Sequence, residues 1–191
     1  MSIPGFKNLS KTFLLLVFLL GIVPHVHAKS YNSMVRRWTQ HKQWYNAETL
    51  QVDMMWHATY FSPEFRRAFE EKHIQIKYLD PVAAARFIAD QEKQQTEGDE
   101  FFIGLYTNKL YKEFSLGKES FWEALLLTED GETLKPIRID MIPLTPYERI
   151  LFPYLNRWAK GYRVVFPKAP TGKKFELIMR SVLGETHLKW H

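Results

Sequence analysis

The chain has 191 residues, no cysteine, 15% aromatic residues and a formal net charge of +5. A chain of this length predicts one globular domain, with room for a helical appendage. The absence of cysteine excludes disulfides, thiol catalysis, thiolate metal sites and a lipid-modified cysteine, so the core must stabilise the fold.

Residues 1–28 have the features of a secretory signal peptide. Lys7 and Lys11 form a basic start, residues 12–23 are an apolar run, and Ala28 holds the last position of a small-residue cleavage site. The apolar run is shorter than the roughly 20 residues that cross a bilayer, which argues against the alternative of an uncleaved membrane anchor. We therefore expect cleavage near Ala28 and a periplasmic or secreted protein.

The mature chain, residues 29–191, is expected to be a single domain without a transmembrane span. Loss of the signal peptide lowers the formal net charge from +5 to +3, because that segment contains two lysines and no acid. Such a mild charge, divided among scattered basic pairs, argues against nucleic acid as a partner.

Residues 31–45 predict an amphipathic helix. Tyr31, Met34, Val35 and Trp38 recur at helical spacing, with basic residues between them. We expect this helix to pack on the domain. The alternative is a peripheral contact with a membrane surface.

Two helix starts follow the first predicted strand, Leu50–Tyr60. In Ser62-Pro63 and Asp80-Pro81, the first side chain can accept from free backbone N–H groups and Pro fits the first helical position. Gly98 is a natural stop for the second helix. The chain thus predicts a helical insertion over about residues 63–95.

Apolar residues alternate with polar ones in short runs that predict β-strands. Seven strands are expected: Leu50–Tyr60, Glu100–Tyr106, Phe121–Thr128, Leu134–Met141, Gly161–Phe166, Lys174–Arg180 and Thr186–Trp190. Pro136 predicts a sheet edge or a bulge, and Thr145 with Glu148 predicts a capping box that starts a short helix. The expected fold is mainly β with a helical insertion (α+β): a seven-stranded antiparallel immunoglobulin-like sandwich plus an N-terminal helix, a helical pair and a short helix.

No catalytic, metal-binding or cofactor-binding motif stands out. His187 and His191 are four residues apart, about 13 Å along a strand, so they cannot share one metal ion. His73 falls on the apolar stripe of a predicted helix, which is typical of a packing histidine. We therefore predict no catalytic residue, no metal site and no cofactor.

The segment 152–158 is irregular and rich in aromatic residues. Tyr154, Arg157 and Trp158 belong to the residue types that are enriched at interface hot spots. They are our candidate partner-binding residues. The alternative is that Phe152, Tyr154 and Trp158 plug the open end of the sandwich.

Five short motifs are spread over the mature chain. They are Ala58-Thr59-Tyr60, Ser62-Pro63-Glu64-Phe65-Arg66, Phe152-Pro153-Tyr154 with Trp158, Tyr162-Arg163-Val164-Val165-Phe166-Pro167, and Val182-Leu183-Gly184. In these motifs the chain resembles uncharacterised exported proteins and predicted lipoproteins of Gram-negative bacteria. The resemblance implies a place in the cell envelope and no particular activity. This chain lacks the cysteine that anchors the lipoprotein members.

Two functions remain open. The first is a non-enzymatic binding or structural module of the cell envelope, whose partner is an unknown envelope protein, glycan or lipid; it rests on the frequent use of sandwiches as binding scaffolds. The second is an envelope-polymer hydrolase with carboxylates such as Asp53, Glu123 or Asp140 gathered by folding. Carboxylates about 5 to 9 Å apart in a cleft would favour the hydrolase, and a flat aromatic patch would favour binding.

Overall fold

The computed structural model describes residues 30–46, 51–108, 116–117, 122–169, 174–181 and 184–191. The signal peptide predicted over residues 1–28 lies outside the described residues. The same holds for the first residues of two predicted strands, Leu50 and Phe121, and for part of the motif Val182-Leu183-Gly184.

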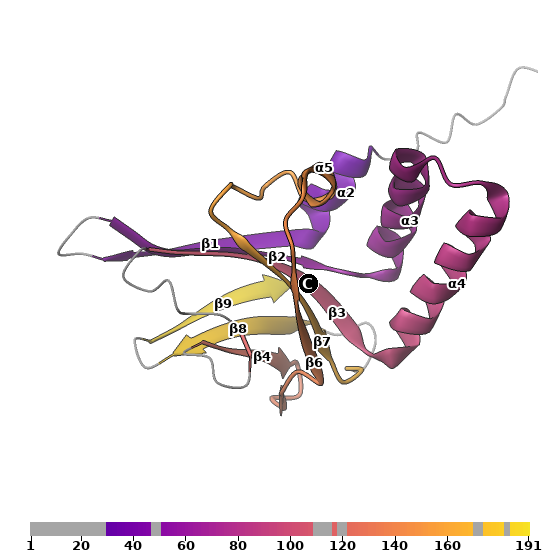
Figure 1. Ribbon diagram of the computed structural model, residues 1–191. Coiled ribbons are helices and arrows are strands. Elements are labelled where there is room, and N and C mark those ends of the chain that lie inside the picture. Colours follow the sequence, from indigo (N-terminus) through magenta and orange to yellow (C-terminus); the bar gives the residue numbers. More distant parts are fainter. Residues whose placement is uncertain (1–29, 47–50, 109–115, 118–121, 170–173, 182–183) are drawn as a thin grey trace, which may run out of the picture.

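Two antiparallel sheets and a layer of helices make up the fold (Figure 1). The five-stranded sheet has the order β1 (Thr39–Asn46), β2 (Gln51–Tyr60), β3 (Asp99–Thr107), β7 (Lys160–Phe166), β6 (Arg138–Ile142). The four-stranded sheet has the order β5 (Thr133–Leu134), β4 (Glu123–Thr128), β8 (Phe175–Ser181), β9 (Gly184–Trp190). The expected mixed, mainly β architecture is confirmed. Within the described ranges there are nine strands rather than the predicted seven.

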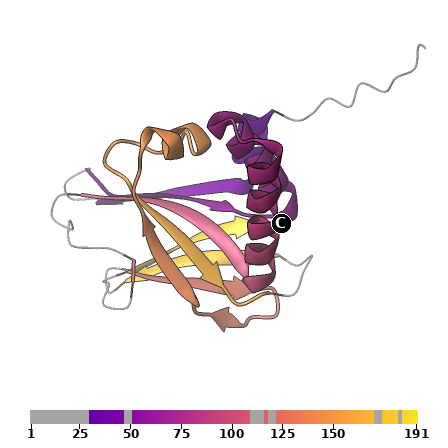
Figure 2. The ribbon, with the colours of Figure 1, turned by 45° about the vertical axis from the view of Figure 1, so that its right-hand side comes forward.

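The helices are α2 (Tyr31–Trp38), α3 (Pro63–Lys77), α4 (Pro81–Glu97) and α5 (Pro146–Leu151). In Figure 1, α2, α3 and α5 lie above the five-stranded sheet and the four-stranded sheet lies below it. Turning the molecule shows α4 alongside one end of the two sheets (Figure 2). The five-stranded sheet is therefore covered on both faces.

The predicted helix starts are confirmed. Ser62 Oγ accepts from the backbone N–H of Phe65 at 3.1 Å, and Asp80 Oδ1 accepts from two backbone N–H groups of the first turn of α4 at 2.9 Å. At α5, Thr145 and Glu148 form the expected capping box. Such side chains satisfy the N–H groups that the first helical turn leaves free.

The strand periodicity correctly identifies the face that points between the sheets. Seventeen buried residues form this inter-sheet core, among them Met54, Trp56, Ala58, Phe101, Ile103, Leu105, Tyr162, Val164, Leu188 and Trp190. The opposite face of β3 contributes Phe102 to a second core beneath the helices, which also contains Met34 and Val35 of α2. The prediction that the N-terminal helix packs on the domain is thus confirmed for α2.

The helix predicted over residues 31–45 is too long. It ends at Trp38, and the chain continues as β1, which pairs with β2 from Thr39 opposite Thr59 to Asn46 opposite Gln51. Trp38 and Trp44 both pack against the inter-sheet core. They are six residues apart, a spacing that alternation in a strand places on one face, whereas a helix would turn the two side chains about 120° apart. Pairing with β2 therefore outweighs the local helical signal.

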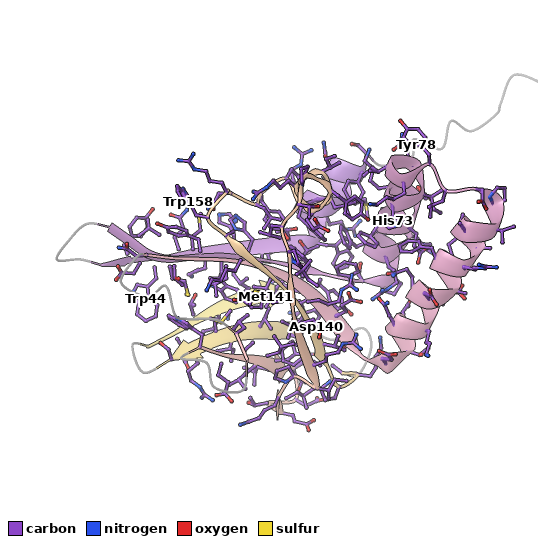
Figure 3. The ribbon with its side chains drawn as sticks, in the orientation of Figure 1. Trp44, His73, Tyr78, Asp140, Met141 and Trp158 are labelled. Atoms are coloured by element: carbon purple, nitrogen blue, oxygen red, sulfur yellow. The ribbon has the colours of Figure 1, made fainter. Side chains whose placement is uncertain are left out.

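The strand predicted over Leu134–Met141 is divided between the two sheets. Its start forms β5 at the edge of one sheet and its end forms β6 at the edge of the other, with Pro136 between them. Pro cannot donate to a strand ladder, so it suits this crossing point. On the edge strand β6, Ile139 packs on the inter-sheet core and Ile142 on the core beneath the helices, while Met141 is 62% exposed (Figure 3).

Candidate functional site

An aromatic pocket of about 760 Å³ opens at one end of the sandwich, beside α4. We call it the end pocket; Trp38, Tyr60, Phe175 and Trp190 form its aromatic wall. These four residues come from the α2–β1 junction, the end of β2, the start of β8 and the end of β9. Only folding brings them together.

Edge and stacking contacts hold the aromatic wall. The Tyr60 ring lies 5.9 Å from the ring of Trp38 and 4.9 Å from that of Phe175, both in edge-on geometry. Phe175 stacks on Trp190 at 5.4 Å. Aromatic pairs prefer these arrangements at such separations, so the wall is preformed.

Asp99, at the start of β3, organises the polar side of the end pocket. Its Oδ1 accepts from the Tyr60 hydroxyl at 3.1 Å and lies 3.3 Å from Lys168 Nζ. Its Oδ2 accepts from the backbone N–H of Ala169 at 2.7 Å. Burial, with the Asp99 carboxylate as the second cause, raises the pKa of Tyr60, so this hydroxyl keeps its proton and remains a donor.

Lys168 and α4 complete the polar side. The Lys168 side chain is 42% exposed, so its ammonium lies at the mouth of the pocket beside Asp99. Glu92, Gln95 and Thr96 of α4 also line the space. The pocket therefore offers flat apolar rings together with groups that form hydrogen bonds and one cation, a combination typical of small-molecule sites.

Of the predicted partner-binding residues, Tyr154 makes contacts within the fold. Its ring stacks on His57 at 4.8 Å, and its hydroxyl shares a hydrogen bond of 2.7 Å with Thr59 Oγ1. Thr59 Oγ1 in turn shares a hydrogen bond of 2.7 Å with Thr39 Oγ1. Tyr154 thus fixes the segment after α5 to β2 and β1.

Arg157 and Trp158 are exposed on the same segment. The Arg157 guanidinium lies 4.4 Å from the centre of the Trp158 ring, and Trp158 is 65% exposed (Figure 3). The structure does not show the segment as a plug of the sandwich end. Phe152 instead stacks on Phe102 at 3.8 Å, in the core beneath the helices.

The carboxylates considered for a hydrolase lie apart. Glu123, on the four-stranded sheet, pairs with Lys135 at 3.1 Å and Arg180 at 3.4 Å, and these contacts lower its pKa. Asp140 lies on β6 (Figure 3) and Asp53 on β2. The strands β3 and β7 lie between β6 and β2, a separation of about 14 Å at the usual strand spacing. That exceeds the separation of paired glycosidase carboxylates.

Sequence reasoning missed the end pocket. The alternation places Tyr60 and Trp190 on strand faces, and the helical spacing places Trp38 in the middle of a helix, whereas α2 ends at Trp38. The available signal was the position of these aromatic residues at strand ends, where a sandwich is open to solvent. Among the described residues, no group of His, Asp and Glu is placed to hold a metal ion.

Comparison of the chain with protein-family models, with curated proteins and with solved structures finds no match. In the part of the chain that the structure describes, no helix is both long and apolar enough to cross a membrane.

Proposed function

We propose that this chain is an exported, non-enzymatic binding module of the cell envelope, and that it holds a small ligand in the end pocket. The observation that carries the proposal is the wall of Trp38, Tyr60, Phe175 and Trp190 facing the Asp99–Lys168 pair. A volume of about 760 Å³ suits a drug-sized molecule. The pocket favours a glycan or lipid fragment over a protein partner, because it is a concave space and not a flat patch.

The ligand class follows from the two sides of the pocket. The rings would stack on a sugar face or an apolar chain. The Lys168 ammonium would bind an oxygen-rich or anionic end of the same molecule. We therefore infer an amphipathic ligand with an apolar or ring-shaped body and a polar head.

We also propose that the two sheets form an immunoglobulin-like sandwich. It is supported by two antiparallel sheets that enclose one core. The proposed export rests on the sequence of residues 1–28. The intact mass of the protein from a native envelope fraction tests it: a chain that starts at Lys29 is expected, and one that retains Met1 to Ala28 would refute cleavage.

The dye 8-anilinonaphthalene-1-sulfonate, which has aromatic rings and one negative charge, tests the pocket. We expect saturable binding that enhances dye fluorescence. Ala169→Trp should weaken it at least tenfold by filling the pocket, and Lys168→Ala should weaken it by removing the cation. Arg157→Ala, on the exposed segment after α5, is the matched control and should bind like the wild type. Equal binding by the wild type and the three variants would show that the end pocket is not the site.

If the dye binds in the end pocket, native mass spectrometry of protein from the envelope fraction would identify the natural ligand.

A further inference from the structure

A second cavity, separate from the end pocket, lies between α3, α4, α5 and the outer face of the five-stranded sheet. Its volume is about 300 Å³, and we call it the helix cleft. Four phenylalanines provide apolar walls: Phe69, Phe87, Phe102 and Phe152. Polar groups at the same cleft include His73, Tyr147 and Arg163.

Arg163 is held in place by a buried charge network. Its Nε lies 2.8 Å from Glu100 Oε1, and Glu100 Oε2 lies 2.7 Å from Arg66 Nη2. Arg66 Nη1 also donates to Gln91 Oε1 at 2.9 Å. The Arg66 and Glu100 side chains are 2% and 1% exposed, whereas Arg163 is 26% exposed. The buried pair thus anchors a guanidinium that reaches the cleft.

The anchoring leaves the outer end of Arg163 available. Glu100 contacts Nε, and within the described part of the chain neither terminal nitrogen of Arg163 has an ion-pair or hydrogen-bond partner. A guanidinium presents these N–H groups in a rigid, planar arrangement that matches two carboxylate oxygens. Holding it by Nε removes much of the freedom that binding would otherwise cost.

His73 and Tyr147 form another polar wall of the cleft. His73 Nδ1 is hydrogen-bonded to the Tyr147 hydroxyl, and the His73 ring stacks on Phe87 at 3.8 Å. Burial, and the Lys77 charge to a lesser degree, lower the pKa of His73. Its ring is therefore neutral at neutral pH, and Arg163 supplies the positive charge. The expected packing role of His73 agrees with its stacking on Phe87.

We infer that the helix cleft binds a small organic monoanion: a carboxylate on a flat apolar body, with the carboxylate on Arg163 and the body among the phenylalanines. A single charge is favoured over a double one, because Asp90 and Glu148 also line the cleft and would repel a dianion more strongly than a monoanion. Glu148 already accepts from the Thr145 backbone N–H at 2.9 Å, so it faces the start of α5. A volume of about 300 Å³ limits the ligand to about the size of one ring with a short substituent.

Benzoate and its neutral isostere benzamide test this inference on the unmodified chain by NMR titration. We expect benzoate to shift the Arg163 and Phe87 resonances in a saturable manner, with an affinity at least tenfold above that of benzamide and of inorganic phosphate. Equal affinities of benzoate and benzamide, or benzoate-induced shifts confined to the end pocket, would overturn it. So would the absence of saturable shifts.

Two arginine variants locate the charge. Arg163→Gln should weaken benzoate binding by roughly tenfold to a hundredfold, the range expected for a lost charged hydrogen-bonding partner. Arg138→Gln is the matched control, since Arg138 lies on the neighbouring β6 and pairs with Glu97 and Asp140; its benzoate affinity should be unchanged. Ala169→Trp fills the end pocket and should also leave benzoate affinity unchanged, which separates this inference from the proposed function. Equal losses in Arg163→Gln and Arg138→Gln would refute a defined carboxylate site. The benzoate and benzamide comparison remains decisive if Arg163→Gln fails to fold.

Discussion

The indole Nε1 of Trp190 donates a hydrogen bond of 3.1 Å to the backbone oxygen of Trp38. This bond ties β9, at the edge of the four-stranded sheet, to the beginning of β1 at the edge of the five-stranded sheet. Both residues also belong to the wall of the end pocket. The contact that closes the sandwich therefore also shapes the proposed binding site.

Removal of β9 should destabilise the fold. A chain that ends at Gly184 loses the ladder with β8 and uncovers Leu177 and Met179, which are fully buried. Because burial of one large side chain contributes about 1.5 to 3 kcal/mol, the loss should be several kcal/mol in urea denaturation. Removal of His191 alone, which is exposed, is the control and should have little effect. A Gly184-terminated chain that melts like the full protein would contradict this account.

The residues of the segment after α5 should separate into structural and surface classes. Tyr154→Ala removes a ring packed on His57 and a hydroxyl bonded to Thr59, so the free energy of unfolding should fall by about 3 kcal/mol. Arg157→Ala should change it by less than about 0.5 kcal/mol, because the residue is exposed. Thermal melts of both variants check this ordering. A larger loss for Arg157→Ala would reverse our assignment.

The exposed Arg157–Trp158 pair remains our candidate contact for a protein partner. Arg157→Ala and Trp158→Ala should each weaken crosslinking to an envelope protein while leaving the melting temperature nearly unchanged, since Trp158 is 65% exposed. Tyr45→Ala, another exposed aromatic residue at 59%, is the control for a general loss of surface aromatic area. Capture that is unaffected by either change in the pair would remove this surface from consideration.

Elements with local chemical signals could be predicted from the sequence. Ser62, Asp80 and Thr145 start helices because each side chain satisfies neighbouring backbone groups, and alternation identified the core faces of β2 and β3. The end of α2 could not be predicted, because Thr39 becomes extended only through pairing with Thr59, 20 residues later. Local spacing carries no information about such a partner.

The two cavities could not be predicted from residue spacing, because each depends on contacts between residues far apart in the sequence. The end pocket joins Trp38 to Trp190, which are 152 residues apart. In the helix cleft, Glu100 and Arg163 are on neighbouring strands whose pairing register the sequence did not reveal. A basic residue within an apolar run, such as Arg163 in Tyr162–Phe166, was the available signal for a buried ion pair.

Loss of the Glu100 charge should be costly. Glu100→Gln preserves volume but leaves two guanidiniums, Arg66 and Arg163, without their shared carboxylate. Breaking a buried pair in this way typically costs about 3 to 5 kcal/mol. Glu97→Gln is the control, because Glu97 pairs with Arg138 at 3.2 Å on the surface, where a pair contributes less than about 1 kcal/mol. Denaturant titration should separate the two variants, and equal losses would show that the buried network is not stabilised by Glu100.

His57 should make stability depend on pH. Its ring lies between Tyr154 at 4.8 Å and His41 at 5.3 Å, and burial together with the His41 charge lowers its pKa from 6.5 to about 4. In the unfolded chain His57 therefore binds a proton below pH 6.5, whereas in the folded chain it binds one only below about pH 4. The His57 contribution to stability is fully present above pH 6.5 and is lost as the pH falls to about 4.

The size of this loss is about 2 kcal/mol, a figure reduced for solvent screening because the ring is partly exposed. His57→Phe should flatten the pH dependence of the free energy of unfolding between pH 6.5 and 4. His187→Gln changes a histidine on the other sheet and should leave the contribution of His57 to this pH dependence intact. An NMR titration measures the cause directly. His41→Gln should raise the pKa of His57, since it removes the neighbouring charge, and burial should keep that pKa below 6.5. A wild-type His57 that titrates near 6.5 would refute both the burial argument and the expected pH dependence.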